Sequence, residues 1–311
     1  GLGHLERMLA LADALRPGIA AAVVVPEHDD AVRRRVVGRG HVALEVAGET
    51  AVRARSAALE STPDVIVLDG YVFDVPAQER LRDQAPLIVV DDLGLPAACH
   101  LAVNPAPGGE GRRPAGADAF LGGATYALIP PAVVQAREAV PRRGRGRRRV
   151  LVSTGATDPS GLCGRVVATL LAGDATVEVV AVVGPDMRRH DLLDDARLNV
   201  LLQPATLAGA LAAATLFAGA AGTSAVQAAC VGIPAVVTAT ATNQEDQAAA
   251  LAAAGCALAV APDDIATHCL RLLEEPVRCA QMSQRGRVLV DGRGAARVAD
   301  SLRRLIAARA A

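Results

Sequence analysis

Short runs of β-branched and other apolar residues alternate along the chain with stretches in which apolar positions recur at helical spacing. Most of the runs are continuous, which is typical of strands buried on both faces of a parallel sheet. In the first half, strands are predicted at 19–26, 42–46, 64–69, 86–91 and 101–104, and helices at 4–15 and 75–82. The first half is therefore predicted to form an α/β domain.

The second half of the chain repeats this plan. Strands are predicted at 149–153, 177–184, 199–203, 216–218, 235–239 and 257–260, and helices at 159–171, 207–214, 224–231, 244–254, 263–273, 276–286 and 294–310. Between the halves, residues 141–149 hold six Arg among nine residues. Because no aromatic residues are interleaved for base stacking, we interpret this stretch as a solvated linker rather than a nucleic-acid arm.

The pattern predicts two Rossmann-like parallel-sheet domains, residues 1–143 and 150–311, with the last helix near their junction. A ligand site is expected in the cleft between them, at the carboxyl ends of the strands. The length of 311 residues gives each domain enough chain for its own core. A glycine loop that feeds a helix normally follows a strand, and the printed sequence has none before Gly1, so we expect the first strand of that domain to be missing.

Composition excludes several classes of function. All 32 basic residues are Arg. P-loop NTPases, protein kinases, pyridoxal-phosphate enzymes and Schiff-base aldolases each need a Lys amine, so none of them fits. The net charge of −1 gives no global attraction to nucleic acid or to an anionic membrane.

The cysteines and the apolar runs indicate the cellular location of the protein. The six cysteines form no C-x-x-C pair, and several lie in apolar runs, which predicts buried reduced thiols. The first residues show no signal-peptide pattern, and the apolar runs are interrupted before about 18 residues. We expect a cytoplasmic monomer with no membrane insertion and no nucleic-acid partner.

The first candidate site is Gly1-x-Gly3-His4-x-x-Arg7, at the start of the first predicted helix. It differs from a dinucleotide fingerprint because Glu6 occupies the third glycine position. At a helix N-terminus, backbone N–H groups favour an anion and a neutral imidazole, which suits His4 to general-base catalysis. The alternative is a polar residue that caps the helix.

Carboxylates follow two of the predicted strands. Asp69 ends one strand and is followed by Tyr71, and Asp91 and Asp92 end the next. In a doubly wound sheet these ends face the ligand site, which we predict for Asp69. Asp92 is better explained as a helix N-cap or turn residue.

Small-residue loops precede two helices of the second half. They are Ser153 to Asp158, which includes Gly155, and Ala218 to Ser224, which includes Gly219, Gly222 and Thr223. Such helix starts bind phosphate, and two of them suggest a diphosphate ligand. Asn243 and Gln244 add amides at a later strand-to-helix turn, although each feature alone also fits ordinary α/β connections. Zinc-site and serine-nucleophile patterns are incomplete, so we expect no metal and no cofactor.

In this order, the segments resemble the PseG-type UDP-sugar hydrolases of pseudaminic acid biosynthesis and their SpsG-like spore-coat polysaccharide relatives. The resemblance covers nearly the whole chain. Gly1 to Arg7 matches the family's G-x-G-H-x-x-R, and Asp69 to Tyr71 its D-x-Y. Residues 153–158 resemble its S-x-G-G-x-D, 218–234 its A-G-G…E…G-x-P, 243–244 its N-Q, and 290–295 its D-G-x-G-A.

The resemblance implies the GT-B fold and hydrolysis of UDP-2,4-diacetamido-2,4,6-trideoxy-β-L-altropyranose or a related UDP-linked amino-deoxy sugar. It implies that His4 activates water, with Asp69 and Tyr71 as further catalytic residues. The residues expected to bind substrate or nucleotide are Gly3, Arg7, Gly155, Asp158, Gly219, Gly222, Thr223, Ser224, Gln227, Asn243 and Gln244. Two departures from the pattern matter: Ala220 replaces a glycine, and Gln227 replaces the acidic residue expected at the ribose.

Two alternatives to the hydrolase stay open. A GT-B glycosyltransferase would use a sugar or lipid hydroxyl where the hydrolase uses water. A catalytically silent protein that binds nucleotide sugars would fit the loss of the acidic residue at Gln227.

Overall fold

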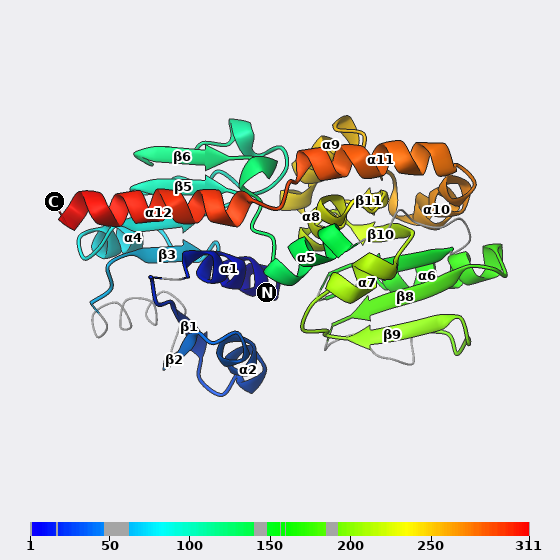
Figure 1. The fold of residues 1–311 in the computed structure, drawn as a ribbon, viewed down its shortest axis with the longest axis horizontal. Coiled ribbons are helices and arrows are strands. Elements are labelled where there is room, and N and C mark those ends of the chain that lie inside the picture. Colours follow the sequence, from blue (N-terminus) through cyan, green and yellow to red (C-terminus); the bar gives the residue numbers. More distant parts are fainter. Residues whose placement is uncertain are drawn as a thin grey trace. The chain divides into compact units, whose positions relative to one another are not determined.

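The computed structural model describes residues 2–16, 18–46, 62–139, 148–155, 157–158, 160–184 and 192–310. The chain divides into two compact units, each an α/β layer structure (Figure 1). One, the N-terminal unit, comprises His4–Pro130 together with Arg293–Ala311. The other, the C-terminal unit, comprises Pro131–Gly292 together with Gly1–Gly3.

The N-terminal unit contains two parallel sheets, with strand orders β1-β2 and β3-β4-β5-β6. Its strands are β1 (Ala22–Pro26), β2 (Val42–Val46), β3 (Ile66–Asp69), β4 (Leu87–Val90), β5 (Leu101–Asn104) and β6 (Ala119–Gly122). Its helices are α1 (Leu2–Leu15), α2 (Asp30–Gly38), α4 (Val75–Arg82) and α12 (Gly294–Ala310), with short η1 (Gly109–Gly111) and η2 (Ala124–Tyr126).

Two helices from opposite ends of the chain cover the sheet β3–β6. The apolar stripe of α1 packs against Ile88 and Val90 of β4. Helix α12 runs along the same sheet (Figure 1) and inserts Val298 and Leu302 into this core, where both are fully buried. The core of the N-terminal unit therefore depends on residues almost 300 positions apart in the sequence.

The C-terminal unit contains one six-stranded parallel sheet in the order β12-β11-β10-β7-β8-β9. Its strands are β7 (Arg149–Ser153), β8 (Glu178–Val183), β9 (Leu198–Leu202), β10 (Leu216–Ala220), β11 (Ala235–Thr238) and β12 (Ala257–Ala259). Its helices are α5 (Pro131–Ala139), α6 (Leu162–Gly173), α7 (Ala208–Ala213), α8 (Thr223–Val231), α9 (Glu245–Ala253), α10 (Ile265–Leu273) and α11 (Pro276–Leu289), with short η4 (Thr242–Gln244) and η5 (Pro262–Asp264). The strand order places β7 and β10, with their following loops, side by side.

The parallel α/β fold class is confirmed, and most of the predicted strands and helices are present. The sequence analysis missed α2, β6, α5 and the short helices η1 and η2. Helix α2 buries only Val36, so its apolar periodicity is weak. The linker stretch 141–147 lies outside the described residues.

The predicted domain limits, 1–143 and 150–311, differ from the structure at two elements. Helix α5 precedes the linker but belongs to the C-terminal unit, where Arg137 donates hydrogen bonds to the carbonyl oxygens of Cys230, Arg287 and Val290 at 2.7–3.0 Å. These carbonyls lie at or near the C-terminal ends of α8 and α11. The last C=O groups of a helix have no hydrogen-bond partner within the helix, and Arg137 supplies one. Helix α12 follows the C-terminal unit in sequence but completes the N-terminal one.

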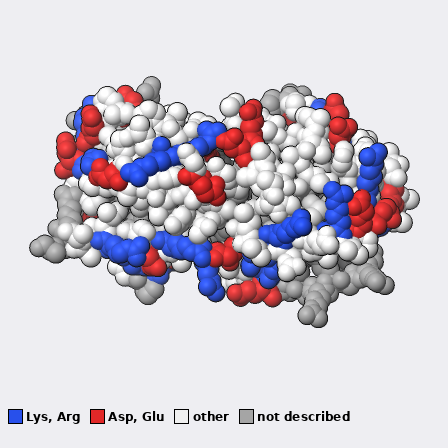
Figure 2. Space-filling model, turned by 90° about the horizontal axis from the view of Figure 1, so that it is seen from above, with Lys and Arg blue, Asp and Glu red and all other residues white. Residues whose placement is uncertain are grey.

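The surface and the thiols complete the description. Five of the six cysteines are buried and Cys279 is partly buried, which agrees with the expectation of buried thiols. Among the described helices, none is long and apolar enough to cross a membrane. On the face shown in Figure 2, the described basic and acidic side chains are interspersed and form no extended basic field.

Candidate functional site

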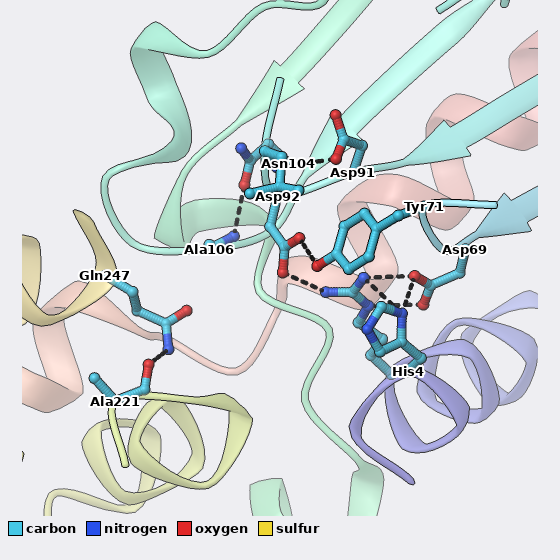
Figure 3. Close-up of polar contacts among 11 residues, drawn as sticks. His4, Asp69, Tyr71, Asp91, Asp92, Asn104, Ala106, Ala221 and Gln247 are labelled. Atoms are coloured by element: carbon cyan, nitrogen blue, oxygen red, sulfur yellow. Dashed lines mark hydrogen bonds and ion pairs between the residues drawn. The ribbon is translucent and has the colours of Figure 1, made fainter. Parts of the chain in front are cut away.

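Five polar side chains of the N-terminal unit meet at the carboxyl ends of β3 and β4. They come from α1, from the end of β3, and from the loops that follow β3 and β4: His4, Arg7, Asp69, Tyr71 and Asp92 (Figure 3). Neighbouring parallel strands end at the same edge of a sheet, so their following residues are brought together. Because α1 packs on this sheet, its first two turns reach the same edge.

His4 and Asp69 form a hydrogen-bonded pair. Nδ1 of His4 lies 2.7 Å from Oδ1 of Asp69, and the two side chains are 29% and 3% exposed. An ionised carboxylate only accepts hydrogen bonds, so the proton of the neutral imidazole is on Nδ1. The lone pair is then on Nε2, which makes that atom the proton acceptor of the ring.

Arg7 keeps Asp69 ionised. Its Nε lies 2.7 Å from Oδ2 of Asp69 and its Nη2 lies 2.5 Å from Oδ1, a two-point ion pair. Burial alone would raise the pKa of Asp69, but the hydrogen bonds from Arg7 and His4 and the charge of Arg7 hold that pKa below its usual range. Burial alone would lower the pKa of Arg7, but Asp69 and Asp92 together raise it.

The predicted roles of Arg7 and Asp92 need correction. Arg7 was expected to bind substrate, but its side chain is 9% exposed and its donors face Asp69 and Asp92. Asp92 was interpreted as a cap or turn residue, but its Oδ2 lies 3.3 Å from Nη1 of Arg7 and its Oδ1 accepts the hydroxyl proton of Tyr71. Asp92 is thus a site residue that the sequence analysis missed.

The turn function expected of Asp92 belongs to its neighbour Asp91. The carboxylate of Asp91 is buried and accepts hydrogen bonds from the backbone N–H groups of Leu93 at 2.9 Å and Leu95 at 2.6 Å. Asn104, at the end of β5, likewise binds the N–H group of Ala106. Both side chains shape loops next to the five-residue site (Figure 3).

The small-residue loops of the C-terminal unit lie at the carboxyl ends of β7 and β10. Gly155 has a φ of +105°, which favours glycine. Asp158 was expected to bind substrate, but its two carboxylate oxygens accept hydrogen bonds from the N–H groups of Leu162 and Cys163, at the start of α6. The structure therefore gives Asp158 the role of a helix cap.

The segment 218–224 joins β10 to α8. Gly219 has a φ of +141°, and a Cβ there would overlap the carbonyl oxygen of Ser153 on the neighbouring strand. Gly219 thus serves the packing of the sheet. Gly222 precedes α8, where no side chain caps the helix and Thr223 and Ser224 form the first turn.

Four amide side chains lie on or near these loops. Gln227 is buried on α8, one turn beyond Thr223. Gln244 ends η4, and its Oε1 accepts hydrogen bonds from the N–H and hydroxyl groups of Thr240 at 3.0 and 3.1 Å; Asn243 precedes it. Gln247, which the sequence analysis missed, donates a hydrogen bond to the carbonyl oxygen of Ala221 (Figure 3). No local pattern distinguishes Gln247 from other polar positions of an Ala-rich helix.

The two sets of residues offer different chemistry. The N-terminal unit presents an oriented imidazole supported by a buried carboxylate, which is the arrangement of a general base. The C-terminal unit presents glycine-rich helix starts, which suit a phosphate group. Within the described part of the chain, no group of three or more His, Cys, Asp or Glu residues is placed to hold a metal ion.

Comparisons with known proteins agree with this architecture. No family model matches the chain. An uncharacterized protein of Methanocaldococcus jannaschii, MJ1062, is 20% identical over 206 residues, which is 63% of this chain and 42% of that protein. The chain therefore spans about two fifths of the length of this relative.

Solved structures resemble the whole chain. The spinosyn forosaminyltransferase SpnP has a TM-score of 0.70 at 19% identity and covers 99% of this chain, with 97% of its own length matched. The calicheamicin glycosyltransferase CalG4 has a TM-score of 0.70 at 17% identity, with 100% and 97% covered. MurG of Acinetobacter baumannii has a TM-score of 0.66 at 16% identity, with 97% and 96% covered. The chain has the GT-B fold.

Proposed function

We propose that the chain is an enzyme that cleaves the glycosyl–phosphate bond of a UDP-sugar, with His4 as the general base. The observation that carries the proposal is the bond between Nδ1 of His4 and Asp69, an aspartate that Arg7 keeps ionised. This bond leaves Nε2 of a partly exposed ring as the proton acceptor. A base held in this way contributes about 10²–10⁴-fold to a rate.

The reaction is a displacement at the anomeric carbon of the sugar. Nε2 of His4 takes the proton of an acceptor O–H group while the acceptor oxygen forms a bond to that carbon. The bond from the same carbon to the phosphate oxygen breaks, and the nucleoside diphosphate leaves with the electron pair. The N–H groups at the start of α8 and the loop around Gly155 are proposed to stabilise its charge. Similarity to a structure described as a rhamnosyltransferase complexed with thymidine diphosphate supports a nucleoside diphosphate ligand.

The first candidate acceptor is the hydroxyl group of a second molecule, which makes the chain a glycosyltransferase. Support comes from the fold, since SpnP and CalG4 are described as sugar transferases and match the chain over nearly its full length. The hydroxyl would approach Nε2 of His4 from the exposed side of the ring.

The second candidate acceptor is water, which makes the chain a hydrolase. The observation that favours it is the meeting of His4, Arg7, Asp69 and Tyr71 in one cluster. These residues are the ones through which the sequence resembles the G-x-G-H-x-x-R and D-x-Y patterns of UDP-sugar hydrolases. A UDP-linked amino-deoxy sugar is the substrate class that this resemblance implies.

One experiment tests the proposal and separates the two acceptors. The purified chain is incubated with a panel of UDP-sugars, with and without hydroxyl acceptors, and released UDP and free sugar are measured. UDP and free sugar without an acceptor identify a hydrolase, whereas UDP only with an acceptor identifies a transferase. Binding of a UDP-sugar without turnover would leave a silent binding protein and contradict the proposal.

The role of His4 is tested in the same assay with His4→Gln. We expect turnover to fall by about 10²–10⁴-fold with UDP affinity nearly unchanged, because the base does not contact the nucleotide. His268→Gln is the matched control, since His268 is half-buried on α10, outside the cluster around His4, and its Nδ1 lies 3.0 Å from the carbonyl oxygen of Asp264. Parental turnover in a folded His4→Gln variant would show that the base is elsewhere.

A further inference from the structure

Asp92 lies at the outer end of the hydrogen-bond network around His4. Its side chain is 12% exposed and contacts two residues of the site, Nη1 of Arg7 at 3.3 Å and the hydroxyl of Tyr71. The backbone that carries it is fixed because Asp91 binds the N–H groups of Leu93 and Leu95. Asp92 therefore offers a carboxylate in a set position to Nη1 of Arg7, whereas Nη2 is the nitrogen of Arg7 that lies near His4.

Nη2 of Arg7 has two possible hydrogen-bond acceptors. Nη2 lies 2.5 Å from Oδ1 of Asp69 and 3.2 Å from Nδ1 of His4. If Nη2 donated to Nδ1, that atom would need a lone pair, and the ring proton would move to Nε2. The imidazole would then present a donor to the acceptor hydroxyl and could not take its proton.

Asp92 favours the arrangement that keeps the base active. Asp92 binds Nη1, while Nε and Nη2 bind Asp69, so three nitrogens of the guanidinium are held by two carboxylates. Tyr71 holds Asp92 through its hydroxyl group and sets its ring edge-on to His4, with centroids 5.5 Å apart and planes at 90°. A single carboxylate thus connects both groups that surround the imidazole.

We propose that Asp92 is a positioning residue that selects the Nδ1–H tautomer of His4 by holding Arg7 on Asp69. The importance of this tautomer for catalysis rests on the proposed function, in which His4 is the general base. The tautomer itself exists, and can be measured, without substrate. It assigns to Asp92 a role distinct from that of Asp69, which binds the ring directly. The groups that face His4 are Asp69, Arg7 and Tyr71, and Asp92 acts on it through the last two.

The test is the ¹⁵N and ¹H NMR spectrum of the full chain labelled at histidine. Spectra are taken at about pH 8.5, well above the usual imidazole pKa of about 6.5. His4→Gln identifies the signals of His4. We expect the Nδ1–H form to dominate in the parent chain. Asp92→Asn removes a charge-assisted hydrogen bond, and we expect the ratio of Nδ1–H to Nε2–H to fall about tenfold.

Asp74→Asn is the matched control. Asp74 is an exposed carboxylate in the loop that follows β3, but it caps α4 by accepting a hydrogen bond from the N–H group of Ala77 at 2.8 Å. Asparagine also caps helices well, so the control changes charge with little change in structure. We expect the tautomer ratio of His4 to stay at the parental value.

Three results would overturn the proposal. One is a parent chain in which His4 carries its proton on Nε2, and another is a folded Asp92→Asn variant with the parental ratio. If Asp92→Asn does not fold, Asp92→Ser is measured in the same way, and loss of the fold in both variants would show that Asp92 serves stability instead. Because no turnover is measured, a negative result here is separate from failure of the UDP-sugar assay, and an active enzyme with an unchanged tautomer would refute this proposal alone.

Discussion

At the scale of single residues, the buried ion pair between Arg7 and Asp69 makes the N-terminal unit sensitive to acid. The folded protein holds the pKa of Asp69 below its usual range, and in the unfolded chain that pKa is about 3.9. The ionised carboxylate therefore contributes stability above about pH 4, and this contribution is lost as the pH falls through the folded pKa.

Asp69→Asn tests this dependence. Removing the two-point charge partner of the buried Arg7, which leaves it only the longer contact with Asp92 among the described residues, should cost about 3–5 kcal/mol at neutral pH. Because asparagine does not titrate, the difference in melting temperature between parent and variant should narrow below about pH 4. Asp118→Asn is the control, since Asp118 is half exposed in its pair with Arg82 and should change stability little at any pH. A difference that stays constant from pH 7 to pH 3 would contradict the role of the ion pair.

The residues of the site could be predicted only in part. The sequence places Asp69 at the end of a strand and His4 at the start of a helix, and the structure brings them to 2.7 Å. Two adjacent aspartates follow β4, and no local signal says which one closes the turn. Asp92 is the site residue because Arg7 on α1, 85 positions away in the sequence, forms an ion pair with it.

At the scale of the elements, Gly219 and Gly222, both in the segment 218–224, serve different purposes. Gly219 has a positive φ and its backbone touches Ser153, so Gly219→Ala should destabilise the C-terminal unit by about 3 kcal/mol or more. Gly209→Ala is the control, because an added Cβ there meets nothing within 4 Å inside α7. It should stabilise the unit by about 0.5–1 kcal/mol. Chemical denaturation of both variants measures the difference, and equal stabilities would refute the packing role of Gly219.

Gly222→Ala separates the fold from the proposed nucleotide site. Its backbone is extended, and an added Cβ would meet Nε2 of Gln244 at 3.6 Å, an ordinary contact. We therefore expect a melting temperature near that of the parent. The methyl group would occupy the approach to the first turn of α8, and UDP binding should weaken about tenfold, or about 1.4 kcal/mol, by calorimetry. Unchanged affinity would place the diphosphate elsewhere.

Elements with strong periodicity were predicted well, and those fixed by packing were not. Strands β2, β5 and β7 and helix α4 have the predicted limits. Helix α5 was missed because what holds it is not visible in its own sequence: Arg137 binds the carbonyl oxygens of distant helix ends. The role expected for Gly219 in phosphate binding followed from its loop, whereas its φ and its contact with Ser153 arise from the pairing of β10 with β7.

At the scale of the whole molecule, a core substitution should destabilise the unit that contains it and leave the other unit unchanged. Leu302 of α12 is fully buried in the core of the N-terminal unit, and Leu272 of α10 is buried in that of the C-terminal unit. Each Leu→Ala change should cost about 2–5 kcal/mol in its own unit. Hydrogen exchange measured by mass spectrometry should show faster exchange in β4 and β5 for Leu302→Ala, and in β7 and β10 for Leu272→Ala. Faster exchange of β7 in Leu302→Ala would contradict the assignment of α12.

The crossing of α12 to the N-terminal unit also sets an order of events during synthesis. The strands of that unit leave the ribosome first, but the buried face that α12 covers cannot close until residues 131–292 have been made. The C-terminal unit, by contrast, has all of its sheet and helices in one stretch from Pro131 to Gly292, and can complete its fold as soon as this stretch has emerged. The half of the chain that is translated first is therefore finished last. Until then its apolar surface at β4 and β5 is exposed to chaperones, proteases and other nascent chains.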